Sequence, residues 1–132
     1  MTLRALPNAQ RQSRPTNCFA ACVATVLDIP IAEVPDACDG NLWDWDAFQQ
    51  WLLPRGLQAI EISLGNGACL YKVAAPVICI VTGNSPRSAD MQHAVVAEFI
   101  GAEGFRLLHD PHEDDLFIGD EVTHVTFLVR LQ

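Results

Sequence analysis

The segment 12–27, QSRPTNCFAACVATVL, constrains the fold more than any other part of the chain. It predicts a loop that runs directly into a helix, because Pro15 stiffens the approach and Asn17 is a residue type that caps helices through its side-chain oxygen. The helix is expected over residues 18–28 and stops before Pro30. Its alanines are small, so neighbouring elements can approach closely, which favours a central, buried helix.

Cys18 falls in the first turn of this predicted helix. Unpaired backbone N–H groups and the helix dipole favour an anion there, so a thiol in that position ionises more readily than an ordinary one. Gln12 stands six residues earlier and carries an amide that can donate a hydrogen bond. The segment therefore indicates a cysteine nucleophile, which needs a histidine base from elsewhere in the chain.

The size and charge of the chain limit the class of protein to which it can belong. The chain has 132 residues, half of them hydrophobic, which predicts one domain over residues 1–132 with a substantial core. The net charge of −8 argues against nucleic acid or an anionic membrane as partner. The longest apolar run, 73–81, is far shorter than the ~18 residues of a membrane span. The predicted partner is a peptide or protein substrate, and the oligomeric state is left open.

Cysteine usage bears on the compartment. Five cysteines and no secretory signal predict reduced thiols and a cytoplasmic protein, although export by a dedicated machine would leave no trace in the sequence. No cofactor is expected.

The order of the predicted elements is helices first and strands second. The second helix is expected over 43–53, with Asp44 near its start, and a short helical turn over 31–35. Turns are expected at 36–41, 65–67 and 101–104, and loops at 83–91 and 110–115. The strands are expected over 57–64, 76–82, 93–99, 105–109 and 122–131. This order predicts an α+β fold in which a helical half packs on an antiparallel meander.

The strands bring a histidine and an aspartate together. His93 opens one predicted strand and Asp110 follows the next. Antiparallel neighbours joined by a short turn place the start of the first beside the end of the second. A thiolate nucleophile needs an imidazole to move its proton and a third group to orient that imidazole. Cys18, His93 and Asp110 therefore form the candidate triad.

These residues resemble the papain-like cysteine peptidases, in particular the double-glycine leader peptidase domains attached to bacteriocin exporters. The likeness rests on Gln12 and Cys18 with Cys22 four residues on, on a histidine opening the strand His93-Ala94-Val95-Val96, and on Asp110-Pro111. It covers nearly the whole chain in order and length. The chain is also similar to short uncharacterised bacterial and phage proteins that end in a His-Asp-Pro-His stretch.

The resemblance implies a papain-like cysteine protease fold, with the nucleophile helix at the N-terminal end of the helical half. It implies Cys18 as nucleophile, His93 as general base and acid, Asp110 as orienting residue and Gln12 as oxyanion-hole donor. Phe19 departs from the family, which usually has glycine after the cysteine. The expected activity is a thiol hydrolase or transferase acting on an amide bond, with peptide cleavage and glutamine deamidation both open.

Other interpretations stand beside this one. The chain could be an inactive papain-like binding module, or a metal-binding protein that uses Cys18, Cys22, His109 and His112. Cys22 on its own is expected to be core packing, and the three tryptophans likewise. Ser85 and Arg87 precede His93 and fit a solvated loop better than the wall of a cleft. The acidic run 113–115 is expected to be a solvated turn.

Overall fold

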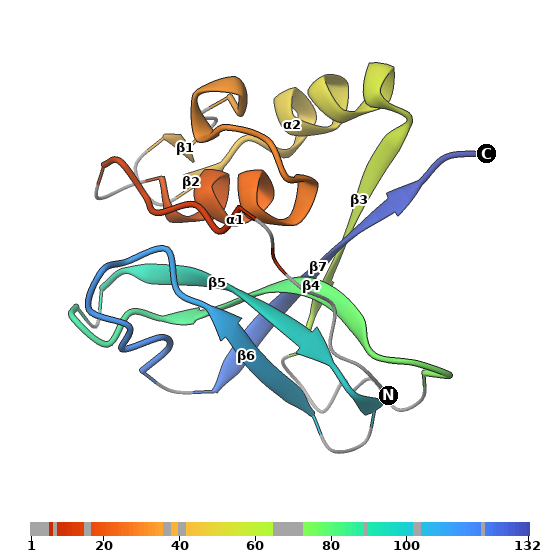
Figure 1. Ribbon diagram of the computed structural model, residues 1–132. Helices are drawn as coiled ribbons and strands as arrows, with labels where there is room; N and C mark the ends of the chain where they lie inside the picture. The colour runs from red at the N-terminus through yellow and green to blue at the C-terminus, as the bar shows by residue number, and fades with distance from the viewer. Residues whose placement is uncertain are drawn as a thin grey trace.

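The computed structural model is a small α+β domain with its helices on one side of an antiparallel sheet (Figure 1). It describes residues 6, 8–14, 17–35, 38–39, 42–64, 73–88, 90–101, 104–119 and 121–132. The turn predicted at 65–67 and part of the one at 36–41 lie outside the described residues. No helix in these ranges is long and apolar enough to cross a membrane.

Helix α1 spans Cys18–Leu27, close to the predicted bounds. It ends at Asp28, which adopts the left-handed conformation with φ 59° and donates its N–H to the carbonyls of the last turn. The 3₁₀ turn η1, Ile31–Glu33, follows as expected. Alanines 20, 21 and 24 of α1 are buried, which confirms the central position predicted for this helix.

Helix α2 spans Trp45–Leu52 and continues as the 3₁₀ turn η2, Leu53–Arg55. The prediction of a start at Trp43 is wrong, because Trp43 belongs to the two-residue strand β2, Leu42–Trp43, which pairs with β1, Cys38–Asp39. Asp44 sets the boundary: its Oδ1 accepts the Ala47 N–H at 3.0 Å and caps the helix.

Phe19 packs between the two helices. Its ring lies 4.6 Å from that of Trp43 and 5.7 Å from that of Phe48, measured between centroids. Trp45 and Trp51 join the same partly buried aromatic group, which confirms their core role. The large side chain of Phe19 is therefore directed into the helical layer.

Five strands form the main sheet in the described part of the chain, in the order β3-β7-β4-β5-β6. Their bounds are Leu57–Ser63, Val77–Asn84, Gln92–Phe99, Phe105–His109 and Val122–Arg130 for β3 to β7 in turn. The predicted meander holds only for β4, β5 and β6. Strand β7 returns to the middle of the sheet, between β3 and β4, because the long loop before it permits a crossover that a tight turn forbids.

The sheet has a core on each face. The core beneath α1 includes Ile80, Ala94 and Val96, and the core on the other face includes Val81, Val95 and Val125. Helix α1 lies mainly over β5 and secondarily over β4. Helix α1 is thereby packed against the strand that carries His93.

Strand β4 is longer than predicted and includes Gly83 and Asn84, which pair with His93 and Gln92. A side chain at Gly83 would meet Ile118 Cγ2 at 2.5 Å. Glycine is needed here because the 110–121 loop crosses against the strand.

Candidate active site

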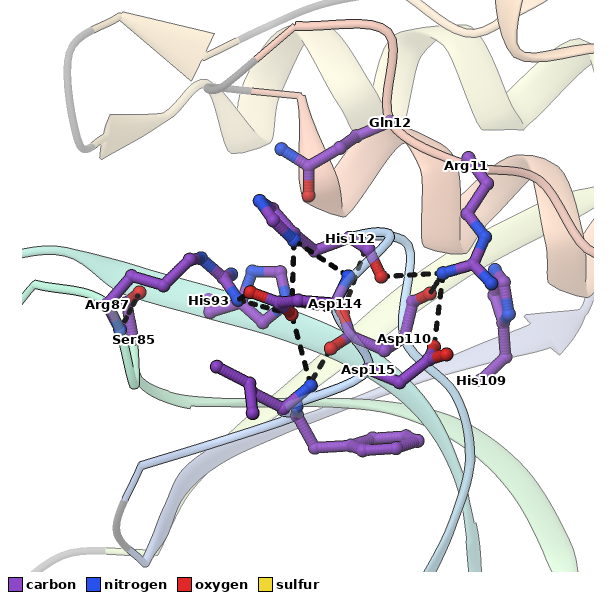
Figure 2. Close-up of polar contacts among 12 residues, drawn as sticks. Arg11, Gln12, Ser85, Arg87, His93, His109, Asp110, His112, Asp114 and Asp115 are labelled. Carbon is purple, nitrogen blue, oxygen red and sulfur yellow. Dashed lines mark hydrogen bonds and ion pairs between the residues drawn. The ribbon is translucent and has the colours of Figure 1, made fainter.

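The predicted adjacency of His93 and Asp110 is observed. His93 is the second residue of β5 and Asp110 directly follows β6, its antiparallel neighbour. The imidazole Nε2 lies 2.7 Å from Asp110 Oδ1, and the two side chains are 3% and 0% exposed (Figure 2). A charge-bearing pair this deeply buried needs close contacts to offset lost hydration.

Asp110 accepts further hydrogen bonds from its own loop. Oδ1 also accepts the His112 backbone N–H at 2.9 Å, and Oδ2 accepts the Phe117 N–H at 2.8 Å. The carboxylate therefore fixes the path of the 110–117 loop as well as the ring of His93.

The protonation state of His93 follows from its burial. Burial lowers the pKa of His93 by more than the hydrogen bond and charge of Asp110 raise it, and Arg87 and His112 lower it further. The ring is therefore neutral at neutral pH. Because a carboxylate only accepts, Nε2 carries the proton that faces Asp110 and Nδ1 has a lone pair available as a base.

Cys18 begins α1 and is partly buried, with Cys22 one turn further on. Burial raises the pKa of the Cys22 thiol well above its usual value, and the charges of Cys18 and Asp110 raise it further. The Cys22 sulfur thus lies within electrostatic range of both Cys18 and Asp110. Cys22 is fully buried, which confirms its predicted place in the core.

A pocket of about 710 Å³ opens beside His93. It is lined by residues 11–14, by His93, and by parts of the segments 85–92 and 111–113. Ser85 and Arg87 both belong to this lining, so they stand at the cleft and not merely in a solvated loop.

Gln12 lies in the same pocket lining as His93. Its backbone N–H donates to the Pro111 carbonyl at 2.9 Å, which ties the N-terminal segment to the loop after Asp110. One amide hydrogen of its side chain is donated to the Arg14 carbonyl at 2.9 Å. A primary amide has a second hydrogen, so this contact is compatible with donation to a substrate.

Asn17 occupies the N-cap position but does not cap through its side chain, contrary to the prediction. Its Oδ1 accepts the Arg14 N–H at 3.0 Å and its Nδ2 donates to Ser13 Oγ at 2.8 Å. The side chain of Asn17 is buried, and it turns back to the two partners that residues 13 and 14 offer. Asn17 thereby fixes the short connection between Gln12 and Cys18.

The acidic run 113–115 is more than the solvated turn expected from sequence. Both carboxylate oxygens of Asp114 accept from Arg87 Nη1 at 2.9 Å, and Asp115 Oδ1 lies 3.1 Å from Arg11 Nη1. These ion pairs join the acidic loop to two other walls of the pocket. Each pair is at least a quarter exposed, so each contributes only about 0–1 kcal/mol.

The two histidines of the metal interpretation have separate surroundings. His109 Nε2 lies 2.7 Å from the Gln10 carbonyl, whereas His112 Nδ1 lies next to Asp114. Over the described ranges, no three His, Cys, Asp or Glu side chains gather in a way that could hold a metal ion.

His112 is the pocket residue that the sequence analysis missed, since it was named only in the alternative metal interpretation. Its ring centroid is 6.5 Å from that of His93, and it lines the pocket. Its position two residues after Asp110 was the available signal, since an aspartate often binds the backbone N–H two residues on.

Comparison with protein-family models gives no match, and comparison with curated proteins gives none either. The assignment of the site therefore depends on its own geometry and chemistry.

Proposed function

We propose that the protein is a papain-like cysteine hydrolase or transferase that cleaves an amide bond. The observation that carries the proposal is the buried contact between His93 Nε2 and Asp110 Oδ1, beside a pocket that Gln12 also lines. A neutral imidazole held in this tautomer by a buried carboxylate is the arrangement that thiol and hydroxyl nucleophiles need. Cys18, at the start of the helix packed on His93's strand, is the nucleophile proposed for it.

The proposed reaction proceeds through a thioester. His93 Nδ1 takes the Cys18 proton, and the sulfur attacks the amide carbonyl carbon while Gln12 and the Cys18 backbone N–H stabilise the oxyanion. The C–N bond then breaks as the proton on Nδ1 passes to the departing nitrogen. Water or another nucleophile releases the acyl group. Asp110 stabilises the imidazolium while it exists and keeps no proton itself.

The substrate is a peptide bond or a glutamine side chain. The pocket beside His93 is lined mainly by polar residues, which suits a peptide segment with exposed backbone. Because Phe19 packs into the helical layer, it does not restrict this pocket.

Selective alkylation tests the nucleophile. Iodoacetamide at pH 7 is expected to label Cys18 first, because burial raises the pKa of Cys22 well above its usual value and that of Cys79 to about 12. These two buried thiols are internal controls. Mass spectrometry of the intact and digested protein identifies the labelled residue, and His93→Ala is expected to slow the labelling of Cys18 alone. Slow labelling of all three to the same extent contradicts the proposal.

A further inference from the structure

We propose that His112 is a second functional histidine of the pocket, which donates a hydrogen bond from Nε2 to a carbonyl oxygen of the bound substrate. This inference deepens the proposed function and rests on it. It assigns His112 the recognition of peptide carbonyl groups, a role complementary to that of His93.

The backbone around His112 fixes where its ring can lie. Its N–H donates to Asp110 Oδ1 at 2.9 Å, the same oxygen that contacts His93, and its carbonyl accepts from Arg11 at 2.6 Å. Both backbone polar groups are therefore used, and the residue is held between the candidate triad and the N-terminal segment. A ring on so constrained a backbone has a defined position relative to His93.

The contact of Nδ1 determines the tautomer of the His112 ring. Nδ1 of His112 accepts the backbone N–H of Asp114 at 3.2 Å. An atom that accepts a hydrogen bond carries no proton, so the neutral ring carries its proton on Nε2. Nδ1 also lies 3.1 Å from Asp114 Oδ1, an acceptor for the proton that Nδ1 carries in the charged ring, and Nε2 carries a proton in that state as well. Nε2 is a donor in both states.

The outer ring nitrogen faces the pocket. His112 is 30% exposed and belongs to the pocket lining together with Gln12 and His93. In Figure 2 the second ring nitrogen points away from Asp114, toward the side on which Gln12 lies. The two histidines thus present opposite functions to one space: His93 offers a lone pair at Nδ1, and His112 offers an N–H at Nε2. The proposed reaction uses the His93 lone pair for the Cys18 proton, and the His112 N–H is left to bind a carbonyl oxygen of the amide substrate.

Two substitutions of His112 distinguish a hydrogen-bond donor to the pocket from a residue that only supports the loop. Asparagine at this position places its oxygen near the site of Nδ1, so His112→Asn keeps the acceptor for Asp114 and removes the pocket donor. Glutamine places its nitrogen near the site of Nε2, so His112→Gln keeps the donor and loses the loop contact. If His112 only supports the loop, asparagine is the better replacement. If His112 binds substrate, glutamine is the better replacement.

The experiment compares two alkylating reagents on the full chain. Iodoacetyl-diglycinamide carries carbonyl oxygens at several distances from its reactive carbon, and iodoethane reacts by the same displacement but has none. His112→Asn is expected to lower the ratio of the Cys18 alkylation rate with the peptide reagent to that with iodoethane about three- to ten-fold, the effect of one hydrogen bond, because any change in His93 affects both reagents equally. His112→Gln is expected to retain most of the peptide rate.

The outcomes distinguish this inference from the proposed function. If iodoethane labels Cys18 no faster in the wild type than in His93→Ala, the nucleophile assignment fails and this inference fails with it. If His93 activates Cys18 but His112→Asn changes both reagents equally or neither, only the role of His112 is overturned. Nitrogen NMR of the imidazole gives a check independent of Cys18, since a proton on Nδ1 in the neutral ring contradicts the inference.

Discussion

At the scale of single residues, Asp110 combines an orienting role with a structural one. Its two oxygens accept from His93 Nε2 and from two backbone N–H groups of the following loop. Because the carboxylate is fully buried, its oxygens have no water as an alternative partner. The same contacts that hold the imidazole therefore hold the pocket wall.

Asp110→Asn is expected to destabilise the fold as well as impair the site. An asparagine that accepts from His93 must point its amide hydrogens at the Phe117 N–H, which leaves buried donors unsatisfied at about 1–3 kcal/mol. Urea unfolding measures this change, and Asp115→Asn, at a side chain that is 56% exposed, is the matched control. Equal stability of wild type and Asp110→Asn would show that the loop does not depend on the carboxylate.

His93 makes stability depend on pH. Its folded-state pKa is lowered from the usual 6.5, so the unfolded chain binds a proton first as pH falls. The contribution of His93 is fully present above about pH 6.5 and is lost as pH falls from there to the folded pKa. Denaturant unfolding at pH 7.5 and 5.5 is expected to show a larger loss for wild type than for His93→Gln. A larger loss for the variant reverses the sign and refutes the assignment.

At the scale of elements, the start of α1 is organised by the loop before it. Asn17 fastens residues 13 and 14 to the helix, and Gln10 donates its N–H to Thr25 Oγ1 at 2.7 Å further along the helix. Strand β5, which contains His93, packs against the same helix. The position of Gln12 relative to Cys18 thus depends on loop contacts as much as on the helix.

Asn17→Ser tests whether position 17 acts as a helix cap or as a loop anchor. Serine caps helices as well as asparagine does but is too short to reach Ser13 and Arg14, so a loss of about 1–2 kcal/mol in unfolding free energy is expected. Asn17→Asp keeps the acceptor for the Arg14 N–H and should lose less. An unchanged stability in Asn17→Ser indicates capping and contradicts the observed geometry.

At the scale of the whole molecule, the N-terminal segment joins the two halves. It contacts α1 through Thr25, and it contacts the loop after Asp110 through Pro111 and through the guanidinium of Arg11. Arg11 Nη1 lies within 3.1 Å of the Asp110 carbonyl and of Asp115 Oδ1. One side chain therefore connects the N-terminal segment to three residues of the loop after β6.

Arg11→Met is expected to lower the unfolding free energy by about 1–2 kcal/mol, because it leaves backbone carbonyls of the 110–112 loop without a charged donor. High salt should reproduce only a small part of this loss, since carbonyl acceptors are less sensitive to screening than the exposed ion pair with Asp115. Arg106→Met, at an exposed position of β6, is the control and should change stability by less than about 0.5 kcal/mol. A loss as large in the control rejects a special role for Arg11.

The sequence by itself determined the elements whose signals are local. Helical spacing after Asn17 placed α1, and β-branched runs placed the five strands of the main sheet to within about two residues, whereas β1 and β2 were not predicted. The short turn between β5 and β6 was sufficient to bring His93 to Asp110, because hairpin geometry depends only on nearby residues. The class of fold followed from the order of these elements.

Only the tertiary structure decided what depends on contacts between distant residues. The insertion of β7 between β3 and β4 follows from burial on both faces of the sheet, for which the sequence has no local signal. The Asn17 side chain left its expected cap because the preceding loop offered two partners, and His112 entered the pocket because Asp110 holds its backbone. Side-chain partners of this kind are selected by three-dimensional proximity, which neither spacing nor propensity encodes.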